Sequence, residues 1–239
     1  SRVEVYQELS NDLAAIEPPV WSGLTTEYLR LHGVGADMLD AEARGLTHEE
    51  TAAAIANADP ALVVFVIYGQ QPSGSTQCMP AGAKTATLLG ELSERPTLAM
   101  GTHPSAMPER TLREEPYIFV CQGEGPLTVE GLAREVKGGG DYSQVPGLWY
   151  HDHDGDIRST PPPPLLSDLG SNLPRQAWDL LDMSAYRAHN WHCFHGLASR
   201  HRYASVQTSL GCPFKCTYCS NHAMEELAEG QYVRYRSSE

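Results

Sequence analysis

Residues 62–68 read Leu62-Val63-Val64-Phe65-Val66-Ile67-Tyr68, an apolar run bounded by Pro60 and Gly69. Three of these residues are valine, and β-branched side chains favour extended backbone. A continuous apolar run of this length, with no polar alternation, is typical of a parallel strand covered on both faces. We therefore expect residues 62–68 to form a central strand of a parallel sheet.

Other strands are expected on both sides of this run. Residues 97–101 and 117–121 are short apolar segments, and residues 36–40 predict a further short strand. The strands alternate with segments of helical pattern, which favours an α/β fold with a doubly wound parallel sheet. The first strand of that sheet is expected upstream of Ser1. We assign residues 1–140 to this domain.

The predicted helices have recognisable starts and stops. One begins at Pro18-Pro19-Val20 and runs to Leu31, with Gly33 as its stop. Another follows a capping box, Thr47 to Glu50, and ends near Asn57. A third follows the loop 69–76 and ends near Glu94. A fourth begins at Gly125-Pro126, because proline is tolerated in a first turn, and ends at the glycines after Lys137.

Residues 141–202 change in character and are assigned to a linker. Residues 145–150 and 157–158 predict a hairpin around the acidic turn 152–155, and a stiff run of prolines follows from Pro161 to Pro164. Residues 172–186 predict a linker with a short helix. We assign residues 203–239 to a second domain, in which residues 206–209 predict a short strand.

The loops after the parallel strands are expected to form a ligand site. In an open α/β sheet, ligands lie at the carboxyl ends of the strands. The loops concerned are residues 69–76, 101–108 and 122–125, which carry glycine and small polar residues. Their backbone amides could hold a flat ligand with a phosphate-bearing tail.

Three cysteines lie close together near the C-terminal end. Cys212, Cys216 and Cys219 have the spacing Cys-x-x-x-Cys-x-Tyr-Cys. Three thiolates can ligate three irons of a cubic iron–sulfur cluster and leave the fourth iron open to a small molecule. Zinc is the alternative, with His222 as a fourth ligand. An electron-carrying ferredoxin would need a fourth nearby cysteine, and a disulfide scaffold does not fit six cysteines scattered over 239 residues.

The cysteine spacing resembles the radical S-adenosylmethionine (radical SAM) superfamily, including the aromatic residue before the third cysteine. The resemblance implies a [4Fe-4S] cluster on Cys212, Cys216 and Cys219, with SAM on the open iron near Phe214 and Tyr218. Reduction of the cluster then cleaves SAM to a 5′-deoxyadenosyl radical. It implies a reducing partner such as a flavodoxin or ferredoxin, and the start of a partial (βα) barrel in which residues 232–237 lead to the second unit.

A second resemblance covers residues ~15–135. The stretch from Gly101 to Glu109 resembles the Gly-x-His-x-x-x-x-Pro-Glu loop of cobalamin-binding radical SAM proteins, and residues 122–125 resemble their Gly-Glu-Gly loop. It implies a flavodoxin-like domain whose cobalamin faces the cluster. The contacts that it implies are Gly69, Gln70, Ser73, Ser75, Thr76, Gly101, Thr102, His103, Gly123, Glu124 and Gly125.

The chain departs from other cobalamin proteins at one motif. An Asp-x-His-x-x-Gly sequence, which supplies a histidine to cobalt, is absent. His103 is therefore expected near the nucleotide tail rather than on cobalt, and some members of the family keep this domain without binding cobalamin. The expected reaction is methyl transfer to an unactivated carbon. The alternatives are radical cyclisation or rearrangement, including oxidative cyclisation of a tetrapyrrole ester, a non-catalytic cobalamin-binding fragment, and a zinc-stabilised α/β protein.

The composition of the chain limits the kinds of partner and the cellular compartment that we expect. The formal net charge is −13, which argues against nucleic acid or an anionic membrane as a default partner. The radical SAM resemblance implies a small-molecule substrate. No apolar run approaches the ~20 residues that span a bilayer. Thiols that hold a cluster imply a reducing compartment, so we expect a cytoplasmic protein. The second domain is expected to be truncated, because a barrel needs far more chain than residues 203–239.

Other polar clusters have simpler interpretations. The segment Trp191 to Gly196 contains His192, Cys193 and His195, and is interpreted as packing rather than as a metal site. Cys78 and Cys121 are expected to pack as small apolar residues. The run from His151 to Asp156 lacks the pattern of a calcium loop and is interpreted as a solvated turn.

Overall fold

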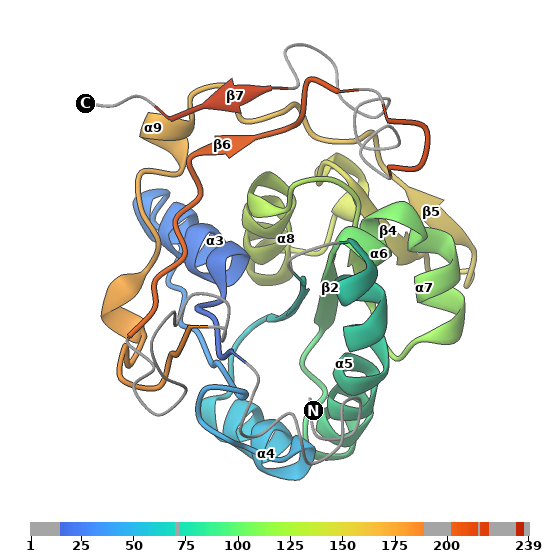
Figure 1. Ribbon diagram of the computed structural model, residues 1–239. Helices are drawn as coiled ribbons and strands as arrows, with labels where there is room; N and C mark the ends of the chain where they lie inside the picture. The colour runs from blue at the N-terminus through green and yellow to red at the C-terminus, as the bar shows by residue number, and fades with distance from the viewer. Residues whose placement is uncertain (1–14, 70–71, 189–201, 215, 220–232, 237–239) are drawn as a thin grey trace.

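The computed structural model describes residues 15–69, 72–188, 202–214, 216–219 and 233–236. These residues form an α/β domain followed by a C-terminal segment that runs along one side of it (Figure 1). Strands β1 (Val63–Ile67), β2 (Thr97–Gly101) and β3 (Phe119–Cys121) are parallel neighbours. The sequence-based α/β fold with a mostly parallel sheet is thereby confirmed.

The order of the strands differs from the expectation in two places. The sheet runs β1-β2-β3-β4-β5, so β1 lies at its end rather than at its centre within the described chain. Strands β4 (Leu148–His151) and β5 (Ile157–Ser159) form the predicted hairpin, but β4 pairs antiparallel with β3. The hairpin therefore extends the main sheet, although the sequence placed it in a linker.

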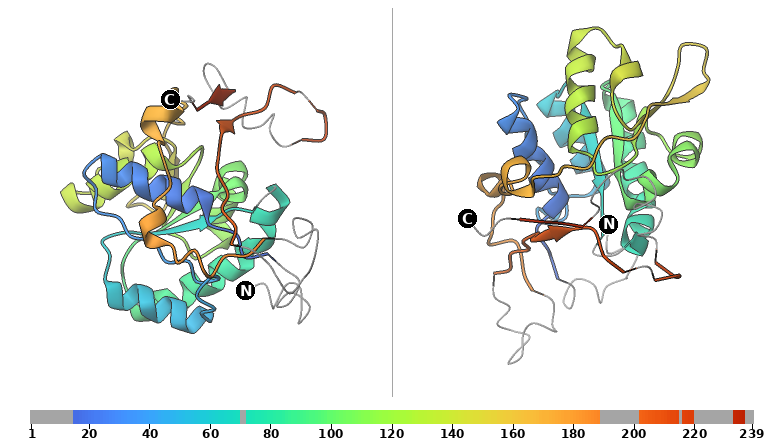
Figure 2. Two further views of the ribbon diagram at one scale, coloured as in Figure 1. Left: turned by 60° about the vertical axis from the view of Figure 1, so that its left-hand side comes forward. Right: turned by 90° about the horizontal axis from the view of Figure 1, so that it is seen from above.

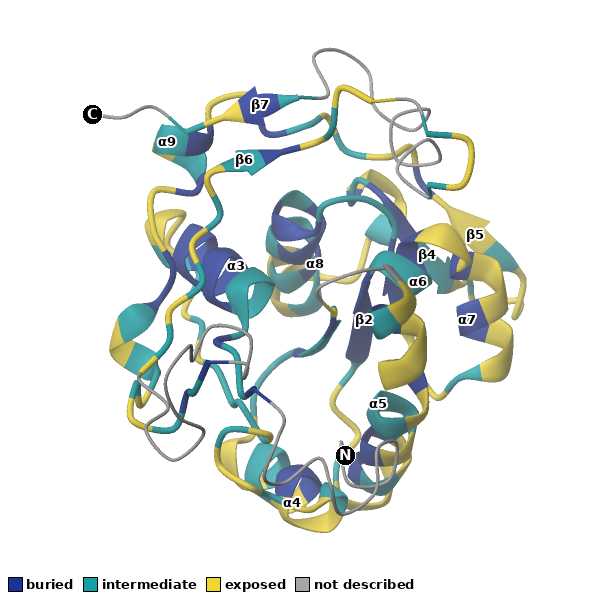
Figure 3. Ribbon diagram, in the orientation of Figure 1, coloured by how far each residue is buried: buried dark blue, intermediate teal, exposed yellow. Residues whose placement is uncertain are grey.

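Both faces of the sheet are covered by helices. Side chains of alternate residues point to opposite faces of a strand, so Leu98 and Met100 pack with α3 (Val20–Leu31) and α8 (Pro126–Gly138). Ala99 packs on the other face with α5 (Pro72–Leu92) and α7 (Pro108–Glu114). Strand β2, which lies between β1 and β3, is buried along its whole length (Figure 3). Burial on both faces explains why β1 is apolar throughout despite its position at the end of the sheet.

The helices agree with the sequence except near the expected ligand loops. Helix α5 begins at Pro72, and residues 102–106 form the short helix α6 (Thr102–Ala106), so both loops are shorter than expected. Proline at a first helical position needs no amide partner, which favours the early start of α5. The remaining elements are α4 (His48–Ala58), η1 (Tyr142–Gln144), α9 (Leu169–Asn172) and η2 (Trp178–Leu180). Of these, η2 is the short helix that was expected in the linker.

The strand predicted over residues 36–40 is wrong. This segment has no regular secondary structure. The carboxylate of Asp40 accepts hydrogen bonds from the backbone amides of Glu42 and Ala43, each at 3.1 Å. Such local bonds favour a turn over an extended strand.

Helix α4 begins at the predicted capping box. Thr47 Oγ1 accepts a hydrogen bond from the Glu50 amide at 3.1 Å, and Glu50 Oε2 accepts one from the Thr47 amide at 2.9 Å. We expect Thr47→Ala to lower the free energy of unfolding by ~1 kcal/mol, because one amide of the first turn loses its acceptor. Urea denaturation followed by circular dichroism measures this loss. Thr87→Ala on the exposed side of α5 is the matched control, and an equal loss in both variants would contradict the assignment.

The C-terminal segment contains an antiparallel pair of short strands. β6 (Ser209–Leu210) pairs with β7 (Arg234–Tyr235) and lies apart from the main sheet (Figure 2). The strand predicted at residues 206–209 is thus shifted towards its C-terminal end. The barrel stays a prediction, because residues 220–232 lie outside the described chain. No helix within the described ranges is long and apolar enough to cross a bilayer.

Candidate functional site

The carboxyl ends of the three parallel strands meet at one edge of the sheet. Ile67, the last residue of β1, is in register with Gly101, the last residue of β2, and Cys121 ends β3. The three loops that the sequence singled out leave the sheet at these points. The structure therefore brings the predicted ligand loops together.

Two serine hydroxyls tie these loops to one another. Ser75, in the first turn of α5, donates to the Ile67 carbonyl at 2.5 Å and accepts from the His103 amide at 3.0 Å. Ser105, on α6, accepts from the Gly123 amide at 2.8 Å. Both serines are buried, at 0% and 1% exposure. Ser75 was predicted to contact a ligand, and its hydroxyl is instead held between β1 and α6.

The two hydrogen bonds of Ser75 give a prediction for stability. Ser75→Ala leaves the buried Ile67 carbonyl and the half-buried His103 amide without this partner, so we expect a loss of ~2 kcal/mol in the free energy of unfolding. Ser73→Ala is the matched control, since Ser73 lies in the same turn but is exposed, and its loss should stay below ~0.5 kcal/mol. Urea denaturation of the two variants checks this. Equal losses would show that the hydroxyl bonds contribute nothing.

The first turn of α5 comes very close to the end of β1. A Cβ placed on Gly69 would lie 2.6 Å from the Cα of Gly74, and one placed on Gly74 would lie 2.9 Å from the Cα of Gly69. Only residues without a side chain allow this approach. The N-terminal end of the 21-residue helix α5 is consequently held at the sheet edge, where its backbone amides favour an anionic group.

A second long helix also begins at this edge. The N-cap of the 13-residue helix α8 is Gly125, which offers no side chain to bond the first-turn amides. Those amides are therefore open to an acceptor from a ligand. Two helix N-termini at one edge suit a molecule with a phosphate group.

His103 lies among these loops as a neutral side chain. Its Nδ1 is 3.1 Å from Thr76 Oγ1, and the two side chains are half-buried and exposed, respectively. Burial and the nearby charge of Arg110 lower the pKa of His103, and Glu114 opposes them. The imidazole is consequently neutral at pH 7 and can donate or accept a hydrogen bond.

Tyr68 and Cys121 form the apolar floor of the edge. The ring of Tyr68 stacks on Trp21, with centroids 5.1 Å apart. Burial, with smaller contributions from Cys121 and Glu124, raises the pKa of Tyr68, and burial raises the pKa of Cys121 to about 12. Both groups are therefore neutral. Cys121 packs as predicted, whereas Cys78 is exposed and the prediction for it is wrong.

The side chain of Glu124 points to the C-terminal segment. Its carboxylate forms an ion pair with Arg234 of β7, and Leu166 donates its backbone amide to the same carboxylate at 3.3 Å. Sequence reasoning missed Arg234, because the alternating pattern Val233-Arg234-Tyr235-Arg236 is ordinary for a strand and does not single out one arginine. Only its burial, at 5% exposure, distinguishes it.

The predicted ligand residues thus occupy different environments. Exposed positions are Gly69, Ser73 and Thr76, half-buried positions are Thr102, His103, Gly123 and Glu124, and buried positions are Ser75, Gly101 and Gly125. Several residues named from the sequence lie outside the described residues. These are Gln70, Trp191, His192, Cys193, His195, Gly196 and His222.

The three motif cysteines lie on the C-terminal segment after β6. They are partly exposed and form no disulfide, and the amide of Cys219 donates to the carbonyl of Cys216 at 3.0 Å. Phe214 and Tyr218 are 71% and 91% exposed. No three His, Cys, Asp or Glu side chains of the described residues lie close enough to hold a metal ion, so the cysteines are not gathered around one point. The chemistry of three thiols in eight residues still fits a cluster.

The acidic turn of the hairpin is closed by its own hydrogen bonds. Asp152 accepts from the amides of Asp154 and Asp156 at 3.0 and 2.9 Å and pairs with Arg158 at 2.7 Å. The hydrogen bond and charge of Arg158 lower the pKa of Asp152. The interpretation as an ordinary turn agrees with these contacts.

Comparison with known proteins gives a family match over the first half of the chain. The model of the B12 binding domain matches residues 10–133. The chain is 31% identical, over 186 residues, to an uncharacterized methyltransferase of Pyrococcus horikoshii, with 77% of this chain and 36% of that protein covered. It is 26% identical to an anaerobic magnesium-protoporphyrin IX monomethyl ester cyclase of Rubrivivax gelatinosus, with 90% and 37% covered. The chain thus spans about a third of the length of these relatives.

Solved structures share the fold. One is OxsB, described as a cobalamin-dependent S-adenosylmethionine radical enzyme, with aqua-cobalamin and S-adenosylmethionine bound. It has a TM-score of 0.62 at 19% identity, and the match covers 88% of this chain and 27% of OxsB. Another is the radical S-adenosylmethionine methyltransferase TsrM of Kitasatospora setae. Its TM-score is 0.61 at 19% identity, and the match covers 95% of this chain and 42% of TsrM.

Proposed function

The chain belongs to the family of B12-binding domains, and on that premise we propose that the carboxyl edge of its sheet binds cobalamin. The observation that carries the proposal is the meeting of three loops and two helix N-termini at this edge, within the matched residues. Cobalamin is a flat ring with a phosphate-bearing tail, which is the kind of ligand that these loops suit. The proposed contacts include Ser73, Thr76, Thr102, His103 and the backbone of Gly123.

The polar residues would hold the nucleotide tail. The neutral imidazole of His103 and the hydroxyl of Thr76 offer hydrogen bonds without burying a charge. First-turn amides of α5 and α8 would face the phosphate. The Asp-x-His-x-x-Gly motif is absent, so the proposal places no histidine on cobalt. The apolar floor around Tyr68 would keep water from one face of the ring.

Titration with aquocobalamin tests this proposal. We expect the visible absorbance of the corrin to change in a saturable way, with one equivalent bound per chain. Thr76→Ala and His103→Ala should each weaken binding by about tenfold, the cost of one or two hydrogen bonds. Thr87→Ala on the exposed side of α5 is the control. No saturable change with the wild-type chain would refute cobalamin binding.

We further propose that the cysteine segment holds a [4Fe-4S] cluster and that the whole protein is a radical SAM enzyme. The donor set supports this, as do the relatives and solved structures that are named as methyltransferases, a cyclase and SAM radical enzymes. When bound, such a cluster would supply one electron for the cleavage of SAM, and cobalamin would supply a methyl group. Cys212, Cys216 and Cys219 would ligate iron, and the exposed rings of Phe214 and Tyr218 would contact SAM.

Methyl transfer to an unactivated carbon is the reaction that we favour. The relative with 31% identity is named a methyltransferase, whereas the cyclase is 26% identical. Radical cyclisation is the second candidate, and it is favoured if the chain binds a cluster but not cobalamin. The proposal includes an external reductant such as a flavodoxin or ferredoxin and a cytoplasmic location. It also includes a small-molecule substrate.

A further inference from the structure

Arg234 is buried against a part of the chain that lies 110 residues away in sequence. Its Nη1 donates to Glu124 Oε2 at 3.0 Å, and its Nη2 donates to Oε1 of the same carboxylate. Nη1 also donates to the Leu166 carbonyl at 2.9 Å. The exposed fractions of the Arg234 and Glu124 side chains are only 5% and 14%. This two-point geometry is specific to a guanidinium and a carboxylate.

Glu124 has little capacity left for a ligand. Both of its oxygens accept from Arg234, and one of them also accepts from the Leu166 amide. A buried carboxylate that lost this partner would remain as an unpaired charge, which is strongly unfavourable. The side chain of Glu124 therefore pairs with Arg234, although the backbone of Glu124 lies in the candidate cobalamin loop.

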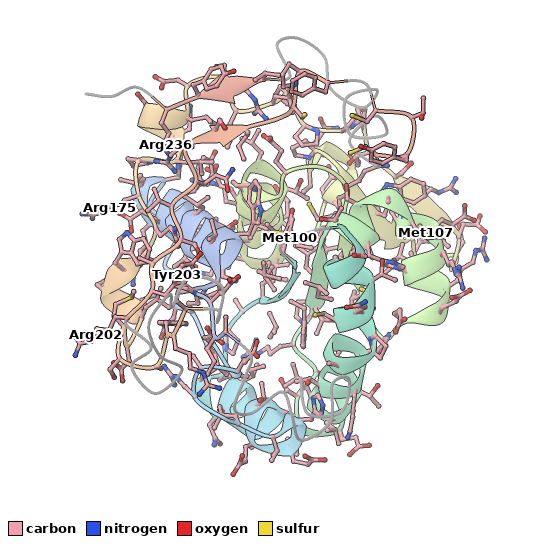
Figure 4. All side chains as sticks on the ribbon, viewed as in Figure 1. Met100, Met107, Arg175, Arg202, Tyr203 and Arg236 are labelled. Atoms are coloured by element: carbon pink, nitrogen blue, oxygen red, sulfur yellow. The ribbon has the colours of Figure 1, made fainter. Side chains whose placement is uncertain are left out.

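The ion pair fixes the strand that precedes the cysteine motif. Arg234 is in register with Leu210 of β6, and Leu210 packs into the core formed with α3 and α8. Cys212 follows Leu210 by two residues. The other end of the hairpin is closed by Arg236, whose side chain lies over the C-terminal segment and donates to the Gln207 carbonyl at 2.6 Å (Figure 4). Arg234 thus attaches the β6–β7 strand pair, called the C-terminal hairpin below, to the sheet edge.

We propose that Glu124 and Arg234 form a clasp that positions the cysteine motif over the carboxyl edge of the sheet. Glu124 is in this view a positioning residue rather than a cobalamin contact. The identity of the group that the positioned thiols bind rests on the proposed function. The clasp itself does not depend on that function. It links the loop after β3 to strand β7, whose antiparallel partner β6 precedes Cys212.

Hydrogen–deuterium exchange of the full chain, without cofactors, tests the clasp. The variants are Glu124→Gln, Arg234→Gln and the exchanged pair Glu124→Arg with Arg234→Glu. We expect either single variant to speed exchange in residues 204–211 and 233–236 by about tenfold or more, because the hairpin loses its attachment. Exchange in β1, β2 and β3 should be unchanged. Arg158→Gln, which breaks an exposed ion pair with Asp152, is the matched control.

Rescue distinguishes positioning from general stability. The exchanged pair restores opposite charges, so it should recover at least part of the protection that each single variant loses. Arg234→Lys keeps the charge but loses the two-point geometry, and should give an intermediate rate; it also replaces Arg234→Gln if that variant does not fold. Unchanged exchange in both single variants, or equal acceleration throughout the sheet with no rescue, would overturn the clasp. A wild-type chain that binds no cobalamin would refute the proposed function and leave these rates untouched.

Discussion

Gly101→Ala is expected to lower the free energy of unfolding by ~4 kcal/mol, and the midpoint of thermal unfolding by about 10 °C. A Cβ at this position would lie 2.0 Å from the Ile67 carbonyl oxygen and 3.2 Å from Ser75 Oγ. The backbone has φ 156° and ψ 178°, a region that is essentially restricted to glycine. Backbone strain and the clash both add to the cost, because the Ile67 carbonyl belongs to a strand end that is in register with Gly101, and Ser75 Oγ is held by its hydrogen bonds to Ile67 and His103.

Gly90→Ala is the matched control for this substitution. Gly90 lies in α5, is exposed, and has nothing within 4 Å of the position of an added Cβ. Alanine in a helix interior is favoured over glycine by ~1 kcal/mol, so this variant should be slightly more stable than the wild type. Chemical and thermal denaturation of both variants measures the difference. A Gly101→Ala protein within ~1 kcal/mol of the wild type would contradict the close approach of the two strand ends.

Removal of any motif cysteine is expected to abolish binding of the proposed iron–sulfur cluster. Cys212→Ala, Cys216→Ala and Cys219→Ala each leave two thiolates where a cubic cluster with an open iron needs three. After anaerobic reconstitution with iron and sulfide, we expect each variant to lose most of the bound iron and sulfide, together with the brown colour. Metal and sulfide analysis, with electron paramagnetic resonance of the reduced protein, measures the loss.

Cys78→Ala provides the control for the cluster experiment. Cys78 is exposed on α5 and forms no disulfide, so it reports any iron that binds to an accessible thiol without a defined site. Iron content that is the same in Cys212→Ala and in the wild type would refute the ligand assignment. Bound zinc without sulfide in the wild type would instead support the zinc-stabilised alternative.

The strands could be predicted from the sequence, but their order could not. The run 62–68 identified β1 because its side chains pack against helices on both faces, α3 and α8 on one side and α5 on the other. An apolar run indicates that both faces of a strand are covered, but it does not indicate which strands are its hydrogen-bonded neighbours. An end strand with two covered faces therefore has the same sequence pattern as a central strand. The pairing of β4 with β3 joins distant segments, and no local pattern encodes it.

The location of the candidate site could be predicted from the sequence, whereas its side-chain contacts were predicted less well. Strand ends followed by small polar residues located the loops, and these loops do meet at one edge of the sheet. The roles of Ser75 and Glu124 depend on Ile67 and Arg234, which lie eight and 110 residues away. A residue type can indicate that a side chain binds something, but the partner is fixed only by tertiary packing. Arg234 was missed for the same reason, because its partner Glu124 is fixed by tertiary packing.

The sequential order of the sheet has a consequence for biosynthesis. Each strand from β2 to β5 pairs with the strand that precedes it in the chain, so the sheet can grow stepwise as the polypeptide emerges from the ribosome. The contact between Glu124 and Arg234 spans 110 residues and closes only when β7 has been translated. The segment that carries Cys212, Cys216 and Cys219 is therefore translated after every strand of the main sheet, and before the strand that attaches it.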